Sequence, residues 1–210
     1  MRIARNLSEN GVVAGNTYDK YGSRNPFVRY LMRGFETSLQ SLVKRTGVRE
    51  IHEVGCGEGY WTLQWLEEGY QARGSDFSTG VIRLARMNAA DRGIDADFKV
   101  ASIYGLVPER DSAELIVCCE VLEHLEDPEQ ALRALREIAS RFLIISVPQE
   151  PLWRILNFAR GHYWRQLGNT PGHLQHWSQN AFIDLIGKYF RIVDRRTPLP
   201  WTMILAKCKV

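Results

Sequence analysis

The stretch Glu53-Val54-Gly55-Cys56-Gly57-Glu58-Gly59 decides the fold expected for this chain. An apolar run at 51–54 leads into three glycines at alternate positions, and a segment of helical character follows at 60–68. A strand, a glycine turn and a helix in this order are typical of a nucleotide-binding βα unit, where glycine lets the backbone approach a ligand. Seventeen residues after Gly59, Asp76 ends a second apolar segment, and a carboxylate there suits the two hydroxyls of a ribose.

The spacing and the charge of this turn argue against a dinucleotide. The pattern is G-x-G-x-G, and the G-x-G-x-x-G that places a pyrophosphate on a helix N-terminus is absent from the turn. Glu53 stands two residues before the first glycine, and a carboxylate there repels a pyrophosphate and attracts a cation. S-adenosylmethionine (SAM) carries an ammonium and a sulfonium and no phosphate. The turn resembles motif I of class I SAM-dependent methyltransferases, and Asp76 falls where that family holds the ribose.

Size and composition are those of one ordinary globular domain. The chain has 210 residues, of which 45% are hydrophobic and 24% charged, and a net charge of +3 does not by itself imply nucleic acid. The four cysteines show no metal-ligand spacing, which favours reduced thiols in a cytoplasmic protein. Neither a secretory signal nor an apolar run of membrane-spanning length is visible in the sequence.

Hydrophobic periodicity predicts strands that alternate with helices. Residues 1–24 form a polar lead-in that we expect to be mobile, and Pro26 opens a helix after it. Strands are predicted at 51–54, 70–75, 97–101, 114–119, 142–147, 190–195 and 202–207. Further helices are predicted at 60–68, 78–92, 128–139 and 178–189. Asp127 and Ser178 are suited to cap the last two of these helices. The alternation predicts a parallel, doubly wound sheet whose ligands bind beyond the strand carboxyl ends.

Other segments resemble the same family. Residues 114–128 are similar to the fourth-strand motif of its small-molecule members, and 146–148 to the turn after the fifth strand. The resemblance implies a Rossmann-like, doubly wound α/β sheet of seven strands with a final antiparallel hairpin. It also implies a lead-in and helix at 1–45 that cover the cofactor site. A SAM-binding methyltransferase domain then occupies 46–210, with an active-site insertion at about 151–177.

The resemblance also implies which residues bind the cofactor. Glu53 and the glycines shape the methionine end, Asp76 holds the ribose, and Phe77 flanks the adenine with the pair at 102–103. Tyr18 and Arg29 of the N-terminal part contact the methionine carboxylate or, in the alternative, are surface residues of a flexible tail. The full set is Tyr18, Arg29, Glu53, Gly55, Cys56, Gly57, Gly59, Asp76, Phe77, Ser102, Ile103 and Glu120. Ser102 is a departure, since many members have an acid there that accepts from the adenine amino group, and a hydroxyl accepts without charge.

The motif Glu120-x-x-Glu123-His124 follows the fourth predicted strand. A helical turn there would place two carboxylates and an imidazole together, a set able to hold Mg²⁺ or another divalent cation. His173 lies four residues before Trp177, in a polar loop that leads into a helix. The combination resembles the ubiquinone-pathway O-methyltransferases and the small-RNA 2′-O-methyltransferases. It implies a metal held by Glu120, Glu123, His124 and His173. The alternative is a metal-free turn anchored by its histidines.

These residues lead to a hypothesis about catalysis. The resemblance implies that Glu120 and His124 act at the acceptor hydroxyl, that a divalent ion lowers its pKa, and that His176 takes its proton. We therefore expect O-methylation of a small or lipid-like hydroxylated acceptor. One alternative is a metal-dependent RNA 2′-O-methyltransferase, and another is a SAM-binding regulatory or scaffold protein without turnover.

The stretch at 152–167 is apolar on one side and basic on the other. A helix packed over the active site is the first interpretation. A peripheral contact with a membrane surface or a lid for a lipid-like acceptor is the second, because Trp and Leu flanked by Arg suit an interface. The charge is too modest and too spread to favour nucleic acid as a partner.

Overall fold

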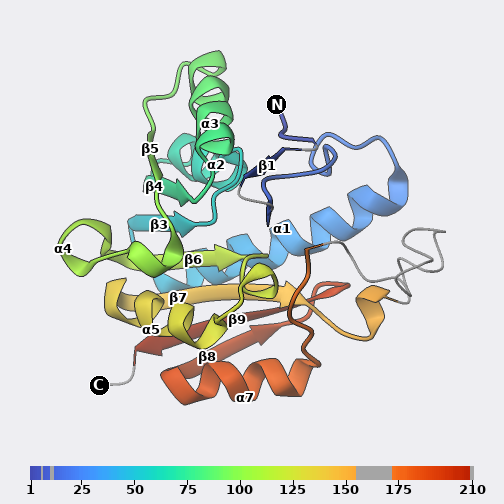
Figure 1. The fold of residues 1–210 in the computed structure, drawn as a ribbon, viewed down its shortest axis with the longest axis vertical. Helices are drawn as coiled ribbons and strands as arrows, with labels where there is room; N and C mark the ends of the chain where they lie inside the picture. The colour runs from blue at the N-terminus through green and yellow to red at the C-terminus, as the bar shows by residue number, and fades with distance from the viewer. Residues whose placement is uncertain (6, 10–11, 155–171, 209–210) are drawn as a thin grey trace.

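The computed structural model describes residues 1–5, 7–9, 12–154 and 172–208. A seven-stranded sheet in this part has the order β5-β4-β3-β6-β7-β9-β8. Its strands are β3 (Glu50–Val54), β4 (Gln71–Asp76), β5 (Asp97–Val100), β6 (Ala113–Cys119), β7 (Ala139–Pro148), β8 (Phe190–Arg196) and β9 (Trp201–Cys208). The first five strands run parallel, and β9 pairs antiparallel with both β7 and β8. The predicted doubly wound sheet and its final antiparallel hairpin are confirmed (Figure 1).

Helices cover both faces of this sheet (Figure 1). The longer ones are α1 (Pro26–Thr46), α2 (Tyr60–Glu67), α3 (Thr79–Asp91), α5 (Pro128–Ile138) and α7 (Gln179–Tyr189). Short turns are η1 (Ile103–Gly105), α4 (Pro108–Asp111) and η2 (Leu122–His124). The predicted caps are confirmed, because the Asp127 carboxylate accepts from the Gln130 N–H and the Ser178 hydroxyl accepts from the Ala181 N–H. Each cap satisfies a backbone donor that the first helical turn leaves unpaired.

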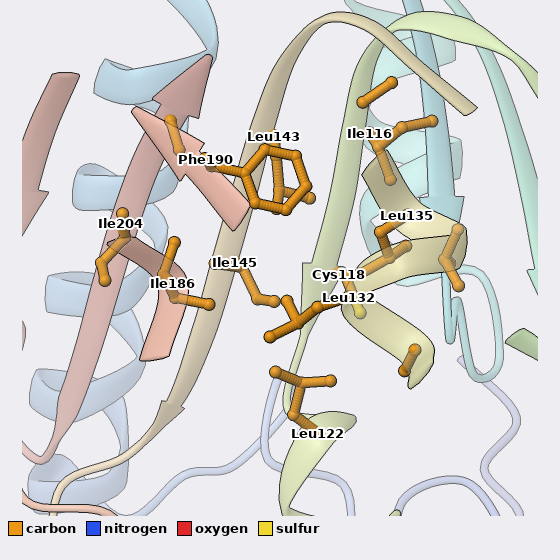
Figure 2. Close-up of a cluster of buried hydrophobic side chains, with 14 of the residues drawn as sticks. Ile116, Cys118, Leu122, Leu132, Leu135, Leu143, Ile145, Ile186, Phe190 and Ile204 are labelled. Carbon is orange, nitrogen blue, oxygen red and sulfur yellow. The ribbon is translucent and has the colours of Figure 1, made fainter. Parts of the chain in front are cut away.

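Alternation along the central strands divides the core between the two faces. On β6, Leu115 and Val117 pack with α1 and α2, whereas Ile116 and Cys118 pack with α5 and α7. Figure 2 shows the second cluster, in which Leu122 of the η2 turn joins side chains of the sheet and of α5. Since Leu122 is fully buried, the turn that carries Glu123 and His124 is fixed to the core.

The lead-in is predicted to be mobile, but its described residues are held to the first βα unit. The buried carboxylate of Glu58, inside the glycine turn, accepts from the backbone N–H of Ala4 at 2.9 Å and of Asn16 at 2.7 Å. The side-chain amide of Asn16 donates to the same carboxylate. A small hairpin of β1 (Ser8–Glu9) and β2 (Val12–Val13) lies between these anchors. A buried carboxylate needs donors, and the lead-in supplies them.

The predicted insertion at 151–177 lies mostly outside the described residues, and so does most of the amphipathic stretch at 152–167. Among the helices that the structure does describe, none combines the length and apolar character that a bilayer crossing requires.

Candidate active site

The glycine turn joins β3 to α2, and all three glycines have positive φ: +77° at Gly55, +54° at Gly57 and +83° at Gly59. A side chain at Gly55 would collide with Val121, which follows β6. A Cβ at Gly59 would lie 2.6 Å from the ring of Phe98 on β5. Two of the glycines therefore permit close packing between chain segments, in addition to any approach to a ligand. Cys56, between them, is buried.

Asp76 ends β4 directly beside this turn. Its carboxylate accepts from the Gly57 N–H at 3.1 Å and from the Ser78 N–H at 3.0 Å. Burial raises the pKa of Asp76, and these two hydrogen bonds oppose that rise. Phe77 is the next residue and is exposed. Asp76, predicted to bind the ribose, thus lies against the glycine turn that is predicted to bind the methionine end of the cofactor.

The pair predicted beside the adenine lies at the η1 turn after β5. The Ser102 hydroxyl accepts from the Tyr104 N–H at 3.3 Å and so caps this short turn. Ile103 is buried in the core on the α5 side. Because one lone pair of the Ser102 hydroxyl already accepts from the backbone, fewer hydrogen bonds from a ligand can be accepted there.

Glu53 is buried at the end of β3. Its carboxylate accepts from the Thr62 backbone N–H at 2.9 Å and from the Thr62 hydroxyl. Burial raises the pKa of Glu53 to about 8, although the Thr62 hydrogen bonds and the nearby Lys20 ammonium lower it. A cationic ligand beside this carboxyl group would therefore stabilise its ionised form.

Lys20 and Tyr21 bring the lead-in over the same acids. The Tyr21 ring stacks on Tyr60 with centroids 3.7 Å apart and meets Trp61 edge-on at 5.5 Å. Burial, followed by the charge of Glu53, raises the pKa of Tyr21 well above its usual value. Lys20 lies over the Tyr21 ring, with its Nζ 5.3 Å from the centroid. Sequence reasoning missed Lys20, because nothing in a polar segment marks a lysine as one that folds inward.

A hollow of about 140 Å³ opens beside these residues, between α1 and the start of α2. Its cationic lining consists of Lys20, Arg29 and Arg33, and Glu36 is its acid. Arg29 therefore faces a concave polar surface, as a carboxylate-binding residue requires. Tyr18, the other N-terminal prediction, is 53% exposed.

Glu120 follows β6 with a strained backbone, at φ +60°. Its carboxylate accepts from the Trp201 indole N–H at 2.6 Å and from the Ser146 hydroxyl at 3.4 Å. Burial raises the pKa of Glu120 to about 7, against Lys20 and these two hydrogen bonds. Trp201 and Ser146 therefore turn this acid toward β7 and β9.

Glu123, His124 and His173 come together although the last two are 49 positions apart in the chain. One ligand atom from each lies within 4.8 Å of the others. Glu123 is 1% exposed, and its two carboxylate oxygens accept no hydrogen bond from the described residues. Such an orphaned buried carboxylate calls for a partner. Glu120, the fourth predicted metal ligand, is not part of this described group.

The histidines of this group are oriented as neutral ligands. His124 Nδ1 lies 2.9 Å from the Gly172 carbonyl, which can only accept, so Nδ1 carries the proton and Nε2 keeps its lone pair. Burial, then the charges of His124 and His176, lower the pKa of His173 to about 3. Burial, then Glu120, raises the pKa of Glu123 well above its usual value. Two imidazoles and one carboxylate form a donor set that suits a divalent transition metal or Mg²⁺.

His176 does not join this group. Its Nδ1 lies 3.4 Å from a carboxylate oxygen of Glu150, the second residue after β7. Sequence reasoning missed Glu150, although the available signal was the one that identified Asp76: an acid at the carboxyl end of a parallel strand.

Comparisons with known proteins relate the chain to methyltransferases. A family model described as a methyltransferase domain matches residues 51–141. A ubiquinone biosynthesis O-methyltransferase of Xanthomonas euvesicatoria pv. vesicatoria (strain 85-10) is 27% identical over 163 residues, 70% of this chain and 67% of that protein. A protein of the same name from Cupriavidus pinatubonensis (strain JMP 134 / LMG 1197) is 24% identical over 66% of this chain and 61% of its own length. The matches thus span about two thirds of these relatives or somewhat less.

Solved structures share the fold. Magnesium protoporphyrin IX methyltransferase from Synechocystis PCC 6803 with bound SAH aligns with a TM-score of 0.67 at 20% identity, over 90% of each chain. The PH0226 protein from Pyrococcus horikoshii OT3 aligns with a TM-score of 0.72 at 18% identity, over 92% of this chain and 96% of its own. The fold is that of the Rossmann-like SAM-binding enzymes. The chain is therefore similar to methyltransferases both in sequence, at 51–141, and in fold.

Proposed function

We propose that this chain is a SAM-dependent methyltransferase that methylates a hydroxyl oxygen of a small or lipid-like acceptor. The observation that carries the proposal is the Glu123–His124–His173 group, with its orphaned buried carboxylate, next to the glycine turn. Val121 links the two, because it packs on Gly55 and precedes the η2 turn. The relatives named O-methyltransferases, at 24–27% identity, support oxygen as the methylated atom.

The first half of the proposed site binds the cofactor, which supplies a methyl group on a cationic sulfur. Glu53 and the turn at 55–59 receive the methionine end, and the Asp76 carboxylate receives the ribose hydroxyls. Phe77, Ser102 and Ile103 flank the adenine. Arg29, in its concave surface, pairs with the methionine carboxylate, and Tyr18 closes over it.

The second half of the site prepares the acceptor. Glu123, His124 and His173 fit a divalent cation, because the carboxylate has no other partner and His124 presents Nε2. Such an ion would lower the pKa of a hydroxyl placed beside it. Glu120 is fixed by its hydrogen bonds from Trp201 and Ser146 and separates the cofactor half of the site from the acceptor half. His176, partly exposed at the rim, takes the proton that the hydroxyl loses.

Metal content and metal-dependent turnover test this proposal together. Purified protein is analysed for bound divalent metals, and transfer from labelled SAM to pools of hydroxylated compounds is measured before and after chelation. We expect a bound divalent ion, loss of transfer on chelation, and recovery when the ion is restored. If the purified protein contains no metal and chelator leaves its methyl-transfer rate unchanged, the proposed role of a divalent ion is contradicted. Transfer to RNA in place of small hydroxylated compounds would support the RNA 2′-O-methyltransferase alternative.

A further inference from the structure

The loop at 172–178 presents two histidines to two different acids. Its backbone N–H groups at Leu174 and Gln175 donate to the Glu123 carbonyl at 2.7 and 3.0 Å. At its other end the Trp177 carbonyl accepts from the Glu150 N–H at 3.0 Å. The loop therefore bridges the η2 turn and the end of β7. His173 meets Glu123 at the first of these places, and His176 meets Glu150 at the second.

Glu150 is a second orphaned acid at this edge of the sheet. Its side chain is 11% exposed, and neither carboxylate oxygen accepts a hydrogen bond from the described residues. His176 Nδ1 lies 3.4 Å from Oε1, within ion-pair distance but without the alignment of a hydrogen bond. Contacts of this kind between a base and its carboxylate partner often tighten only when substrate is bound.

The backbone around Glu150 is fixed independently of this contact. Gln149 donates its N–H to the Pro200 carbonyl at 2.9 Å, and Glu150 donates its N–H to Trp177. Trp177 in turn packs on Phe182 of α7, with ring centroids 5.9 Å apart. Because main-chain bonds and this aromatic contact already hold the loop to the sheet, the Glu150 carboxylate is not needed to anchor it.

We propose that Glu150 is the positioning residue for His176, making the two a carboxylate–imidazole pair that removes the acceptor proton. The inference rests on the proposed function, in which His176 is the base. A carboxylate at Nδ1 fixes the tautomer with its lone pair on Nε2 and stabilises the imidazolium that forms. The acceptor O–H proton moves to Nε2 and the oxygen lone pair forms the new C–O bond. The C–S bonding pair stays on sulfur, giving S-adenosylhomocysteine, and the proton leaves through the 34% exposed ring.

The sign of the effect on His176 follows from its neighbours. Glu150, from the end of β7, lies beside its ring, and His173, from its own loop, is electrostatically coupled to it. A carboxylate stabilises the imidazolium, so removing the charge of Glu150 weakens His176 as a base. Because the base acts when neutral, the acidic limb of the rate profile should move to lower pH while the maximal rate falls.

The test compares Glu150→Gln and Glu150→Asp with wild type. Glu129→Gln is the control, since Glu129 of α5 forms an exposed ion pair with Lys188 of α7. The His176 titration is followed by NMR in isotope-labelled protein and assigned with His176→Asn, and kcat/KM is measured across pH. For Glu150→Gln we expect the acidic limb to move to lower pH, the His176 NMR titration to move with it, and kcat to fall by about 10–100-fold. Glu150→Asp keeps the charge and should keep the limb, and Glu129→Gln should match wild type.

The outcomes separate this inference from the proposed function. An unchanged His176 titration in Glu150→Gln, or a shifted titration with an unshifted acidic limb, would overturn the pairing while methyl transfer to a hydroxyl still stands. A loss of thermal stability with normal kcat and an unmoved limb would assign Glu150 a structural role and also overturn it. If wild type methylates no hydroxyl at all, the proposed function fails and the proton-removal role fails with it. The NMR titration then still reports whether the two groups interact.

Discussion

The cofactor half and the acceptor half of the proposed site are built by different means. In the cofactor half, the two acids lie at the carboxyl ends of parallel strands, and backbone N–H groups hold them: Gly57 and Ser78 donate to Asp76, and Thr62 donates to Glu53. In the acceptor half, a loop distant in sequence brings His173 and His176 to acids on two other elements. The acids there, Glu123 and Glu150, accept no hydrogen bond from the described residues.

This difference has a physical consequence. Satisfied backbone contacts make the cofactor half rigid and tie its function to the fold. The acceptor half contains buried acids without partners, and such groups cost stability unless a ligand pairs with them. Changes in the first half should therefore damage the fold and SAM binding together. Changes in the second half should affect turnover alone.

The largest expected effect comes from Gly55→Ala in the cofactor half. The new Cβ would collide with Val121 at a residue whose φ is +77°, so both overpacking and backbone strain arise. We expect about 3 kcal/mol of lost stability and no measurable SAM binding. Gly47→Ala is the matched control, because Gly47 has φ +65° but nothing within 4 Å of the added Cβ; it should lose only about 1 kcal/mol and bind SAM normally. Urea unfolding and calorimetry measure both, and equal SAM affinity in Gly55→Ala and wild type would refute the steric role.

Glu123→Gln in the acceptor half should show the opposite pattern. It keeps the side-chain volume but removes the carboxylate, so we expect loss of bound metal and about 100-fold slower methyl transfer, with SAM affinity unchanged within about twofold. Because the substitution removes an unpaired buried acid, the variant should be at least as stable as metal-free wild type. Glu126→Gln, at an exposed acid three positions further along the chain, is the control for metal content and rate. Weakened SAM binding in Glu123→Gln would show that the two halves are not separable.

A smaller, pH-dependent effect is expected from Glu53→Gln. With a pKa of about 8, Glu53 holds a proton at neutral pH in the cofactor-free protein, whereas a cationic ligand favours its ionised form. Binding of SAM should therefore release a proton near pH 7, and SAM affinity should rise as pH increases toward about 8. Calorimetry in buffers of different ionisation enthalpy measures this release. Glu53→Gln should abolish it and weaken binding by about tenfold; a variant that still releases the proton would place the titration at another group.

The smallest effect is expected where the lead-in is anchored. Asn16→Ala removes a side-chain donor to Glu58 but leaves the two backbone donors in place. We expect a loss of about 1 kcal/mol in stability and faster hydrogen exchange in the lead-in, with kcat little changed. Hydrogen exchange by mass spectrometry checks this. Exchange as slow as in wild type would mean that the backbone donors alone hold the segment.

The contrast between the halves also explains what the sequence could predict. The strand, turn and helix around 51–68 form by local contacts, so periodicity and glycine spacing were sufficient to locate Gly55 and Asp76. The caps at Asp127 and Ser178 are equally local, and both were predicted. In the acceptor half, long-range packing decides which residues come into contact. The group of Glu123, His124 and His173 was reached through resemblance to related enzymes.

Residues that gain their role only from tertiary structure could not be predicted in this way. Trp201 contacts Glu120 because β9 pairs antiparallel with β7, which no local pattern encodes. Lys20 reaches the buried acids because Glu58 holds the lead-in against the turn. The contacts of the lead-in could not be predicted for the same reason, since the carboxylate that anchors it lies 42 positions after Asn16.

A single-turnover reaction tests the central claim most directly. The protein is mixed with SAM whose methyl carbon is isotope-labelled and with a pool of hydroxylated acceptors, and NMR then identifies the atom that carries the label. We predict a labelled methyl ether and an equal amount of S-adenosylhomocysteine, with the ether lost in Glu123→Gln while SAM remains bound. Label on nitrogen or carbon, or ether formation that Glu123→Gln leaves unchanged, would contradict the account.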